Sequence, residues 1–518
     1  MAVVAAAAAG VYLPTLWGQF VYDDVAQIVI SDYIHKPGHF WEVLTFRVMG
    51  RDVLDYNRPV MLLSLMMDSA IWGREAFGYH LTNVVLHAAC SVLLLIVLLR
   101  MFRRLFPPEA GPAKPLLGAF AGALLFAVHP ANSEAVSPVA FREDVLVAFF
   151  AMVILLLVDW FPSKRVRVTL LLGAACAVLM LAAVASKESA AVVPAFLVVY
   201  WLVVRRGRQW RPWVGLVAAG FVVAGLFAAA RFTFTPQNSE VFPVAPRLGG
   251  SLGGTLEIQP RIWALQLAEI FRPDLLCADQ TVDYSIKGIG LGFALGALAA
   301  VGVGVVLVSI GNPGAGLGAA LYWLAILPAS NLLPMYRQIA DRYLYFPMAG
   351  VAMAVGALTC RLRIPAGRGA RAALAAGALA VLVVLGVFTV RRTLVWRDNM
   401  SLWTDTAARN PRSFTAHNNL GFALYHAGKY EEAVESFQRC CRLTGLADPR
   451  AGLAITYDAM GHAELADSAM AEAIRRDRRY ADTAHLVRSL RWRLDEAEKL
   501  QKVIDRLRSR SASRPAAG

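Results

Sequence analysis

Two adjacent carboxylates, Asp23 and Asp24, occupy the segment FVYDDVAQI, directly after the first long apolar stretch of the chain. A carboxylate beside a reacting hydroxyl group can act as a general base, and a neighbouring carboxylate can orient it. Aspartate is also a common helix N-cap, so either residue could have only a structural role. The pair therefore predicts either a catalytic base with its supporting group or a helix cap.

A second group of ionisable residues flanks an expected loop in FAVHPANSEAVSPVAFREDVLVAFF. It consists of His129, Glu134, Arg142, Glu143 and Asp144. A planar guanidinium group matches the oxygens of an anion, so we expect Arg142 to face an anionic ligand held in place by the neighbouring carboxylates. An internal network of ion pairs is the alternative interpretation.

Two further basic residues lie at the ends of apolar stretches. Lys187, followed by Glu188, occupies a tight connection in ASKESAAVVP, and Arg342, followed by Tyr343, lies in QIADRYLYFP. Ionisable groups near membrane depth are costly and often mark function. Both cations are predicted to lie at the depth of the lipid phosphates. Together with Arg142 they could neutralise a departing phosphate. Anchoring to lipid headgroups is the alternative.

The elements that must position these residues are apolar helices. The chain has 518 residues, of which 57% are hydrophobic and 17% charged, unlike the average soluble domain. Eleven apolar stretches are each about long enough to cross a hydrocarbon core of roughly 30 Å. They occupy residues 2–17, 80–99, 116–131, 143–161, 168–186, 189–204, 213–230, 288–310, 315–333, 342–360 and 372–390. The sequence therefore predicts an all-α, polytopic membrane protein with about 11 transmembrane helices. A shorter segment, 260–271, contains two charged residues and is predicted to lie at the membrane interface.

The formal charge of +14 lies mainly in four connections between these stretches, not in a patch typical of nucleic-acid binding. Fifteen basic residues occur there with one acidic residue, Glu109. The basic residues are Arg100, Arg103, Arg104, Lys114, Lys164, Arg165, Arg167, Arg205, Arg206, Arg208, Arg211, Arg361, Arg363, Arg368 and Arg371. With eleven spans these connections share one side, which the positive-inside rule makes cytoplasmic. The N-terminus is then cytoplasmic, the ionisable clusters are extracytoplasmic, and no nucleic-acid partner is expected.

Shifts in composition predict the domain boundaries. Residues 1–391 form the membrane domain, with long external segments at 18–79 and 231–287. Residues 392–480 contain a linker and two tetratricopeptide repeats, because Gly428, Ala433 and Cys440 recur after 33 positions as Gly461, Ala466 and Ala473. Residues 481–507 are expected to form a capping helix or a degenerate third unit, and residues 508–518 a disordered tail.

In this order, the motifs resemble those of the GT-C glycosyltransferases, in particular the transmembrane and tetratricopeptide-repeat branch that includes the protein O-mannosyltransferases. The resemblance rests on FVYDD, YNRPVMLLSLMMDSAIWGREAFGYHLTNVVLH, FAVHPANSEAVSPVAFREDVLVAFF, SKESAAVVP, DRYLYFP and WRDNMSLWTDTAARNP. It implies inverting transfer of a sugar, such as mannose, from a polyprenyl or dolichyl phosphate carrier to an acceptor hydroxyl group, for example on protein Ser or Thr. The transfer would take place at the extracytoplasmic face.

The resemblance also implies roles for residues of this chain. Asp23 would be the base and Asp24 its support, while the carrier phosphate would be bound by Arg142, Lys187 and Arg342. The donor pocket would be formed by His129, Glu134, Glu143, Asp144, Glu188 and Tyr343. The repeat domain is smaller than the arrays of many relatives, which puts an extended protein acceptor in doubt.

Other interpretations remain open at this stage. A membrane-anchored repeat scaffold would need no clustered ionisable groups, and a transporter of lipid-linked sugars would need a polar path through the bilayer. The aspartate pair could bind Mg²⁺ or Mn²⁺, but two carboxylates near cations make a poor site unless a substrate phosphate completes it. The composition, rich in Ala, Gly and Arg, favours a bacterial plasma membrane.

Overall fold

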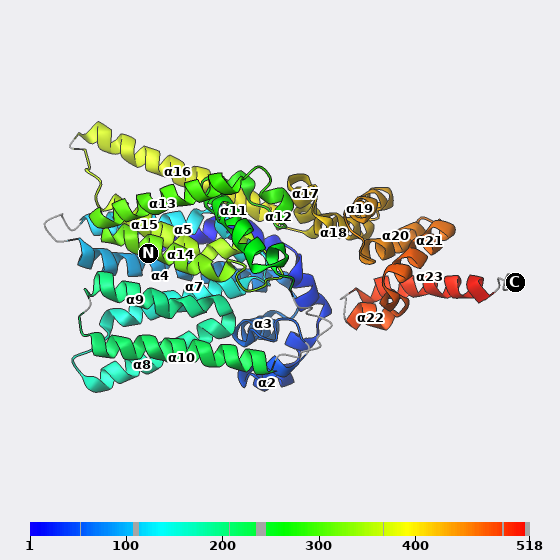
Figure 1. Cartoon of the computed structure of the whole chain (residues 1–518), viewed down its shortest axis with the longest axis horizontal. Coiled ribbons are helices and arrows are strands. Elements are labelled where there is room, and N and C mark those ends of the chain that lie inside the picture. The colour runs from blue at the N-terminus through cyan, green and yellow to red at the C-terminus, as the bar shows by residue number, and fades with distance from the viewer. Residues whose placement is uncertain are drawn as a thin grey trace.

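The computed structural model describes residues 1–51, 53–106, 113–206, 208–234, 245–365, 367–488 and 492–512. Helices dominate these residues, and no β-strand occurs among them. A broad bundle of helices forms one end of the molecule, and a narrower helical domain extends from it toward the C-terminus (Figure 1). The predicted all-α fold is confirmed.

Each of the eleven predicted spans contains a helix. These helices are α1 (Ala2–Tyr12), α4 (Ala76–Leu105), α5 (Ala113–Val128), α7 (Arg142–Leu157), α8 (Val166–Ser186), α9 (Val193–Val204), α10 (Trp210–Phe234), α13 (Leu291–Gly311), α14 (Pro313–Ile326), α15 (Tyr345–Thr359) and α16 (Arg368–Val395). By length and composition, five helices of the described residues, α4, α8, α10, α13 and α16, could cross a membrane alone. A sixth span results if α5 and the bent segment Pro130–Val136 are counted together. The number eleven therefore stays a prediction.

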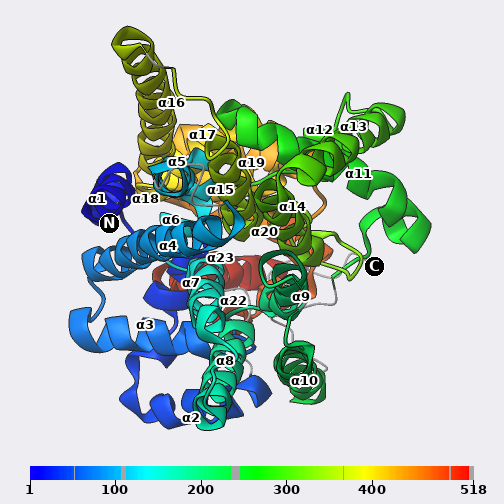
Figure 2. The same ribbon diagram turned by 90° about the vertical axis from the view of Figure 1, so that its left-hand side faces the viewer.

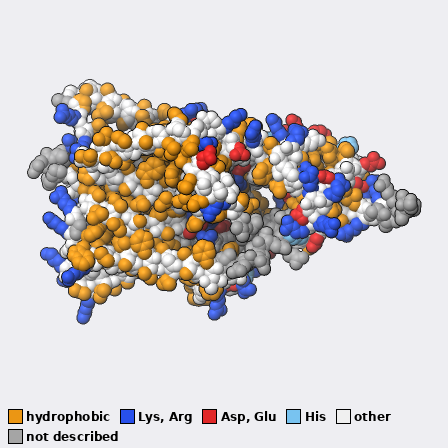
Figure 3. All heavy atoms as spheres, in the orientation of Figure 1, with side chains coloured by type: hydrophobic (Ala, Val, Ile, Leu, Met, Phe, Trp, Pro, Cys, Tyr) orange, Lys and Arg blue, Asp and Glu red, His pale blue; other side chains and the backbone are white. Residues whose placement is uncertain are grey.

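The outer helices of the bundle expose apolar side chains. Only 6% of the most apolar window of α13, and of that of α16, is buried inside the protein. Seen end-on, both helices lie at the periphery, whereas α5, α14 and α15 lie close to the centre (Figure 2). Hydrophobic side chains also cover the visible flank of the bundle (Figure 3). A helix with an exposed apolar surface of this extent is suited to lipid as its solvent.

Glycine allows the central helices to approach each other closely. A side-chain carbon at Gly318 on α14 would lie 2.5 Å from the carbonyl oxygen of Gly350 on α15, and one at Gly350 would lie 2.5 Å from that of Gly318. Small residues at such crossings let backbones pack without clashes. The packing of α14 against α15 therefore depends on both glycines.

The four basic connections lie at one end of the bundle. Figure 3 shows Lys and Arg side chains along the edge opposite the repeat domain, and the turns that carry them lie at that end in Figure 1. The two segments predicted to be external lie at the other end. They contain α2 (Phe40–Leu44), α3 (Pro59–Trp72), α11 (Leu252–Phe271) and α12 (Val282–Ser285), and the segment predicted to be interfacial is the second half of α11. Glu109 lies outside the described residues.

The C-terminal domain consists of helix pairs. After α17 (Asn399–Arg409) come α18 (Phe414–His426), α19 (Tyr430–Leu443), α20 (Asp448–Ala459), α21 (Ala463–Arg476), α22 (Thr483–Arg488) and α23 (Leu494–Ala512). Gly428 and Gly461 make the turns within the two repeats with φ angles of 73° and 80°, a conformation that glycine adopts without strain. A side-chain carbon at Gly452 would lie 2.4 Å from the ring of Phe437, which explains the small residue there.

The end of the chain differs in detail from the expectation. The described residues of 481–507 form two helices, α22 and α23, and their assignment as a cap or as a degenerate third unit stays a prediction. Leu486, Leu500, Val503 and Ile504 of these helices belong to the same apolar core as Phe437. Helix α23 continues to Ala512 and so enters the segment predicted to be disordered. Residues 513–518 lie outside the described residues.

Candidate active site

The two adjacent aspartates have different surroundings. Tyr22 has a left-handed backbone conformation with φ 55°, so the chain turns sharply just before Asp23. Asp24 is fully buried, and its carboxylate accepts hydrogen bonds from the backbone N–H of Ala140 at 2.6 Å and of Val21 at 3.2 Å. Asp24 therefore joins the first external segment to the loop that precedes α7.

Asp23 has an exposed side chain, and no hydrogen bond or ion pair to it occurs among the described residues. Protein nevertheless surrounds it on several sides. Burial raises the pKa of Asp23 to about 6; Arg342 opposes this shift, and the acidic Asp55, Glu143 and Glu134 add to it. An accessible carboxylate with free lone pairs and a pKa close to neutral is suited to accept a proton.

Burial also raises the pKa of Asp24, to about 7, although the hydrogen bond from the backbone of Ala140 opposes the shift. Both oxygens of Asp24 accept hydrogen bonds from backbone amides. These oxygens are directed into the protein, so the geometry fits a group that holds the loop rather than one that meets a substrate.

A network of ion pairs lies beside Asp23. Lys187, in the turn after α8, binds Asp144 at 2.6 Å and lies 3.6 Å from Glu143. Arg58, just before α3, donates to the same Glu143 oxygen at 3.1 Å and to Asp55 at 2.8 Å. Three segments far apart in the sequence thus meet at Glu143.

Arg342 forms a second part of this cluster. Its guanidinium group is ion-paired with Glu134, and its backbone N–H donates to the other Glu134 oxygen at 3.1 Å. The guanidinium carbon lies 3.9 Å from the centre of the Phe141 ring, an arrangement typical of a cation–π contact. The Nε atom of Arg342 is buried and has no acceptor among the described residues.

Two further residues of the predicted donor pocket lie at the edge of this cluster. The Tyr343 ring lies 5.3 Å from Nζ of Lys187, and its hydroxyl group donates to the carbonyl oxygen of Arg337 at 2.9 Å. Glu188 is ion-paired with Arg231 at 3.4 Å. The structure thus brings Asp23, Glu134, Glu143, Asp144, Lys187, Arg342 and Tyr343 together, with Glu188 next to Lys187.

Arg142 requires a correction to the expectation. Its side chain is fully buried and is ion-paired with Asp68 at 2.5 Å. It also donates to Asn83 at 2.6 Å and to the carbonyl oxygen of Tyr79 at 2.9 Å. These contacts direct the guanidinium group between α3 and α4, which agrees with the alternative of an internal ion-pair network.

His129 also has internal partners for both ring nitrogens. Its Nδ1 accepts from the backbone N–H of Ala131 at 3.2 Å, and its Nε2 lies 3.0 Å from the carbonyl oxygen of Ile270. Because Nδ1 accepts, the proton belongs on Nε2, from which it is donated to Ile270. His129 therefore joins the end of α5 to α11 and does not face the ionisable cluster.

Sequence reasoning did not assign Asp55 or Arg58 to the cluster. The signal available was the YNRP motif, which is polar and directly precedes an apolar helix. Sequence reasoning did not pair Asp341 with Glu269. Gln280 joins these two acidic residues, because it donates to Asp341 at 2.8 Å and to Glu269 at 2.7 Å. Burial and the nearby Glu134 raise the pKa of Asp341 to about 8.

The described residues contain no group of three or more His, Cys, Asp and Glu side chains placed to hold a metal ion. Asp23 and Asp24 do not form a two-carboxylate site either, because the backbone of Ala140 and Val21 occupies Asp24.

Comparisons with known proteins agree with this organisation. A tetratricopeptide-repeat family model matches residues 414–445, which include α18 and α19. The chain is similar to protein O-mannosyl-transferase F38B6.6 of Caenorhabditis elegans, with 24% identity over 83% of this chain and 61% of that protein. It is also similar to protein O-mannosyl-transferase Tmtc3 of Drosophila melanogaster, with 27% identity over 74% of this chain and 48% of that protein. Human protein O-mannosyl-transferase TMTC1 is 24% identical over 85% of this chain and 55% of its own length.

No solved structure matches the chain. The chain spans about half to three fifths of the length of these relatives, which come from animals, so the bacterial plasma membrane stays a prediction. The similarity nevertheless extends over 74–85% of this chain. The predicted resemblance is therefore confirmed, and this chain is related to the tetratricopeptide-containing protein O-mannosyl-transferases.

Proposed function

We propose that this protein is a GT-C-type inverting glycosyltransferase that moves mannose from a polyprenyl or dolichyl phosphate to a Ser or Thr hydroxyl group of a protein. The observation that carries the proposal is the accessible carboxylate of Asp23, which lies in the field of Arg342 beside a cluster of buried ion pairs. The names of the relatives support the choice of mannose and of a protein acceptor.

In the proposed reaction, the acceptor hydroxyl group attacks the anomeric carbon of the sugar. Asp23 takes the hydroxyl proton as the new C–O bond forms, and the bond from the anomeric carbon to the phosphate oxygen breaks. The polyprenyl phosphate leaves with the bonding electrons, opposite the attacking oxygen, so the configuration inverts. Asp24 acts as a positioning residue, because it holds the loop that carries Asp23.

Lys187 and Arg342 are the proposed ligands of the departing phosphate, and Arg58 joins them. Their charges would stabilise the negative charge that develops on the leaving group. Arg142 does not share this role, because its side chain is fully buried and Asp68 and Asn83 hold its guanidinium group between α3 and α4. Glu134, Glu143 and Asp144 hold the three cations in place through the ion pairs described above.

The position of the cluster supports transfer at the extracytoplasmic face. The segment 18–79, which carries Asp23 and contains α2 and α3, lies at the end of the bundle toward the repeat domain, while the basic connections lie at the opposite end (Figures 1 and 3). The positive-inside rule assigns those connections to the cytoplasm. Donor, base and acceptor would therefore meet outside it.

The test is a transfer assay with the full chain in nanodiscs, radiolabelled mannosyl phosphates of dolichol and undecaprenol, and a Thr-containing peptide. We expect mannosyl transfer by the wild type and a loss of about 100- to 10,000-fold for Asp23→Asn. Asp283→Asn is the matched control, because Asp283 is an exposed acid of the second external segment. Comparison of the anomeric configuration in donor and product tests inversion.

Equal rates for Asp23→Asn and the wild type would refute Asp23 as the base. Absence of transfer with every donor would refute the enzyme. Movement of the labelled lipid across a vesicle membrane without any transfer would instead favour a transporter.

A further inference from the structure

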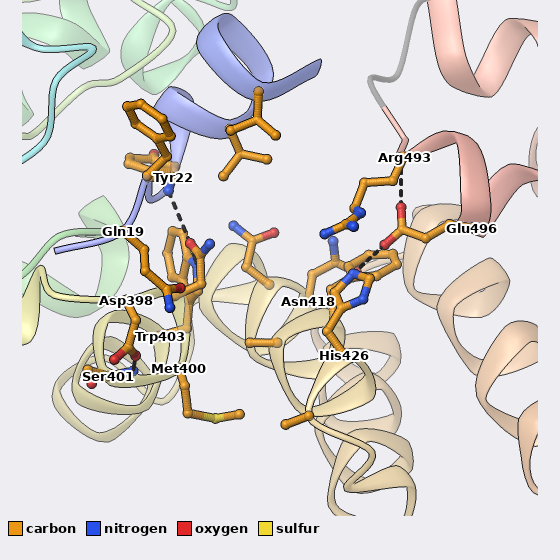
Figure 4. Close-up of a pocket in the computed structure, with 18 of the residues that line it drawn as sticks. Gln19, Tyr22, Asp398, Met400, Ser401, Trp403, Asn418, His426, Arg493 and Glu496 are labelled. Atoms are coloured by element: carbon orange, nitrogen blue, oxygen red, sulfur yellow. Dashed lines mark hydrogen bonds and ion pairs between the residues drawn. The ribbon is translucent and has the colours of Figure 1, made fainter. Parts of the chain in front are cut away.

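A cavity of about 970 Å³ lies between the membrane domain and the repeats. One wall consists of residues from the segment 19–30, and the others come from the region of α17 and α18, from Asp448 at the beginning of α20, and from the beginning of α23 with the two residues before it. Figure 4 shows side chains from these parts of the chain around a common space, with Gln19 and Tyr22 across from His426, Arg493 and Glu496. The cavity thus adjoins the segment that carries Asp23.

Three asparagines line this cavity, and two of them are fixed. Asn399 accepts from the backbone N–H of Tyr22 at 3.1 Å, and Asn418 donates to Asp448 at 2.7 Å. Asn419, one position further on α18, is partly exposed and has no hydrogen-bond partner among the described residues. A primary amide offers both donors and an acceptor, which is the complement of a peptide group.

The remaining lining residues argue against other classes of occupant. The charged residues of the wall are balanced, with three basic and three acidic side chains: Arg397, Lys429, Arg493, Asp398, Asp448 and Glu496. Such a balance selects neither a polyanion nor a polycation. The asparagines and charged groups equally disfavour a lipid chain. Trp403 and Trp492 are only 1% and 5% exposed, so neither indole presents an open face, and the partly exposed rings of the wall are Phe20, Tyr22 and Phe422.

We propose that this cavity binds an extended segment of the acceptor polypeptide, with Asn419 hydrogen-bonded to its backbone. The inference rests on the proposed function, and it specifies that the acceptor protein is bound as an extended chain. Tyr22 lines the cavity, and the Cα atom of Asp23 is about 3.8 Å from that of Tyr22. An extended chain advances roughly 3.3–3.6 Å per residue, so a Thr a few residues from the bound part can reach Asp23. Helical repeats commonly bind extended chains on such surfaces.

Two substitutions test the cavity without removing a contact within the protein. Asn419→Ala removes the free amide, and Ala427→Trp fills the space from an exposed position in its wall. Gln438→Ala is the matched control, because Gln438 is an exposed amide of the same repeat that is not part of the cavity wall. Thermal unfolding of the purified full chain identifies any variant with an altered fold.

The first measurement is the fluorescence anisotropy of a fluorescein-labelled peptide, Ala-Thr-Val-Thr-Ala-Thr-Val, with the full chain in nanodiscs. We expect Asn419→Ala to weaken binding roughly five- to tenfold, Ala427→Trp to abolish it, and Gln438→Ala to leave it unchanged. Unchanged binding by Ala427→Trp would overturn the proposal. Absence of peptide binding to the wild type, together with binding of fluorescein-labelled mannopentaose, would identify a glycan site and also overturn it.

The second measurement separates this proposal from the catalytic one. In the transfer assay, Asn419→Ala should raise the KM for the peptide and leave kcat and the KM for the lipid donor unchanged. Peptide binding that Ala427→Trp abolishes, in a protein that transfers no sugar, would support the cavity and refute the enzyme. Transfer that neither variant changes would support the enzyme and refute the cavity.

Discussion

Adjacent aspartates provide a sharp test of the site, because the structure gives them opposite properties. We expect Asp23→Asn to abolish transfer without lowering stability, and Asp24→Asn to lower stability. The two substitutions are the same in chemistry and differ by one position. Any general effect of charge or of expression should therefore affect both alike.

The magnitude for Asp24 follows from its hydrogen bonds. Its two oxygens accept from the backbone N–H of Ala140 at 2.6 Å and of Val21 at 3.2 Å, at a fully buried position. Asparagine keeps only one acceptor oxygen and turns an NH₂ group toward one of the two N–H donors. Leaving a buried donor unsatisfied costs about 1–3 kcal/mol. Burial also raises the pKa of Asp24 to about 7, so removal of the charge offsets part of this cost, and we expect a net loss of unfolding free energy toward the lower end of that range.

For Asp23→Asn, the expected change in stability is zero or positive. Its pKa rises from 3.8 to about 6 in the folded protein, so folding favours the protonated form. The stability that this provides is present below pH 3.8 and is lost as the pH rises through 6. At pH 7.5 an asparagine removes the unfavourable charge, and no hydrogen bond among the described residues is lost. The thermal midpoint should therefore stay the same or rise.

The assay is differential scanning fluorimetry of both variants in detergent at pH 7.5, together with the transfer assay. A thermal midpoint that falls for Asp23→Asn as far as for Asp24→Asn would refute the reasoning, because Asp23 would then be a structural residue. Full transfer activity of Asp23→Asn would refute the assignment of Asp23 as the base.

Three further outcomes are expected. Because the base form of Asp23 is lost below its pKa of about 6, kcat/KM should fall about tenfold from pH 7 to pH 5, and a flat pH profile would contradict this. Arg142→Met leaves Asp68 as an unpaired buried charge and should cost about 3–5 kcal/mol of unfolding free energy, measured by denaturant titration; an unchanged midpoint would show that the pair adds nothing. Gly318→Val should lower the thermal midpoint by overpacking α14 against α15, at a cost of ~1–3 kcal/mol. Gly302→Val on α13 is the control and should leave the midpoint unchanged, because a side-chain carbon there has nothing within 4 Å.

The helices and the repeats could be predicted from local patterns. An apolar stretch that is long enough to span a bilayer must form its backbone hydrogen bonds internally, so helix is the result almost wherever it occurs. Likewise, Gly428 and Gly461 indicate turns in the left-handed conformation, with φ angles of 73° and 80°. Such features depend on residues within one or two turns of each other, which the sequence displays directly.

The partners of the charged residues could not be predicted in the same way. Arg142 and Lys187 both lie next to apolar stretches, yet one is bound to Asp68 on α3 and the other to Asp144 on α7. Which acid meets which base depends on how helices distant in sequence pack together. Asp55 and Arg58 lie in an irregular part of the first external segment, where no periodicity indicates which way a side chain points.

The different roles of Asp23 and Asp24 show how the two parts of the candidate site are connected. The hydrogen bond from Ala140 to Asp24 joins positions 116 residues apart. The residue next to Asp24 is the proposed base, Asp23. The loop that contains Ala140 leads directly into Glu143 and Asp144, which bind the proposed phosphate ligand Lys187. A shift of the loop at Ala140 would therefore move base and phosphate site relative to each other. Catalytic groups must be held close to their productive geometry, so Asp24 can act on the reaction without touching the substrate.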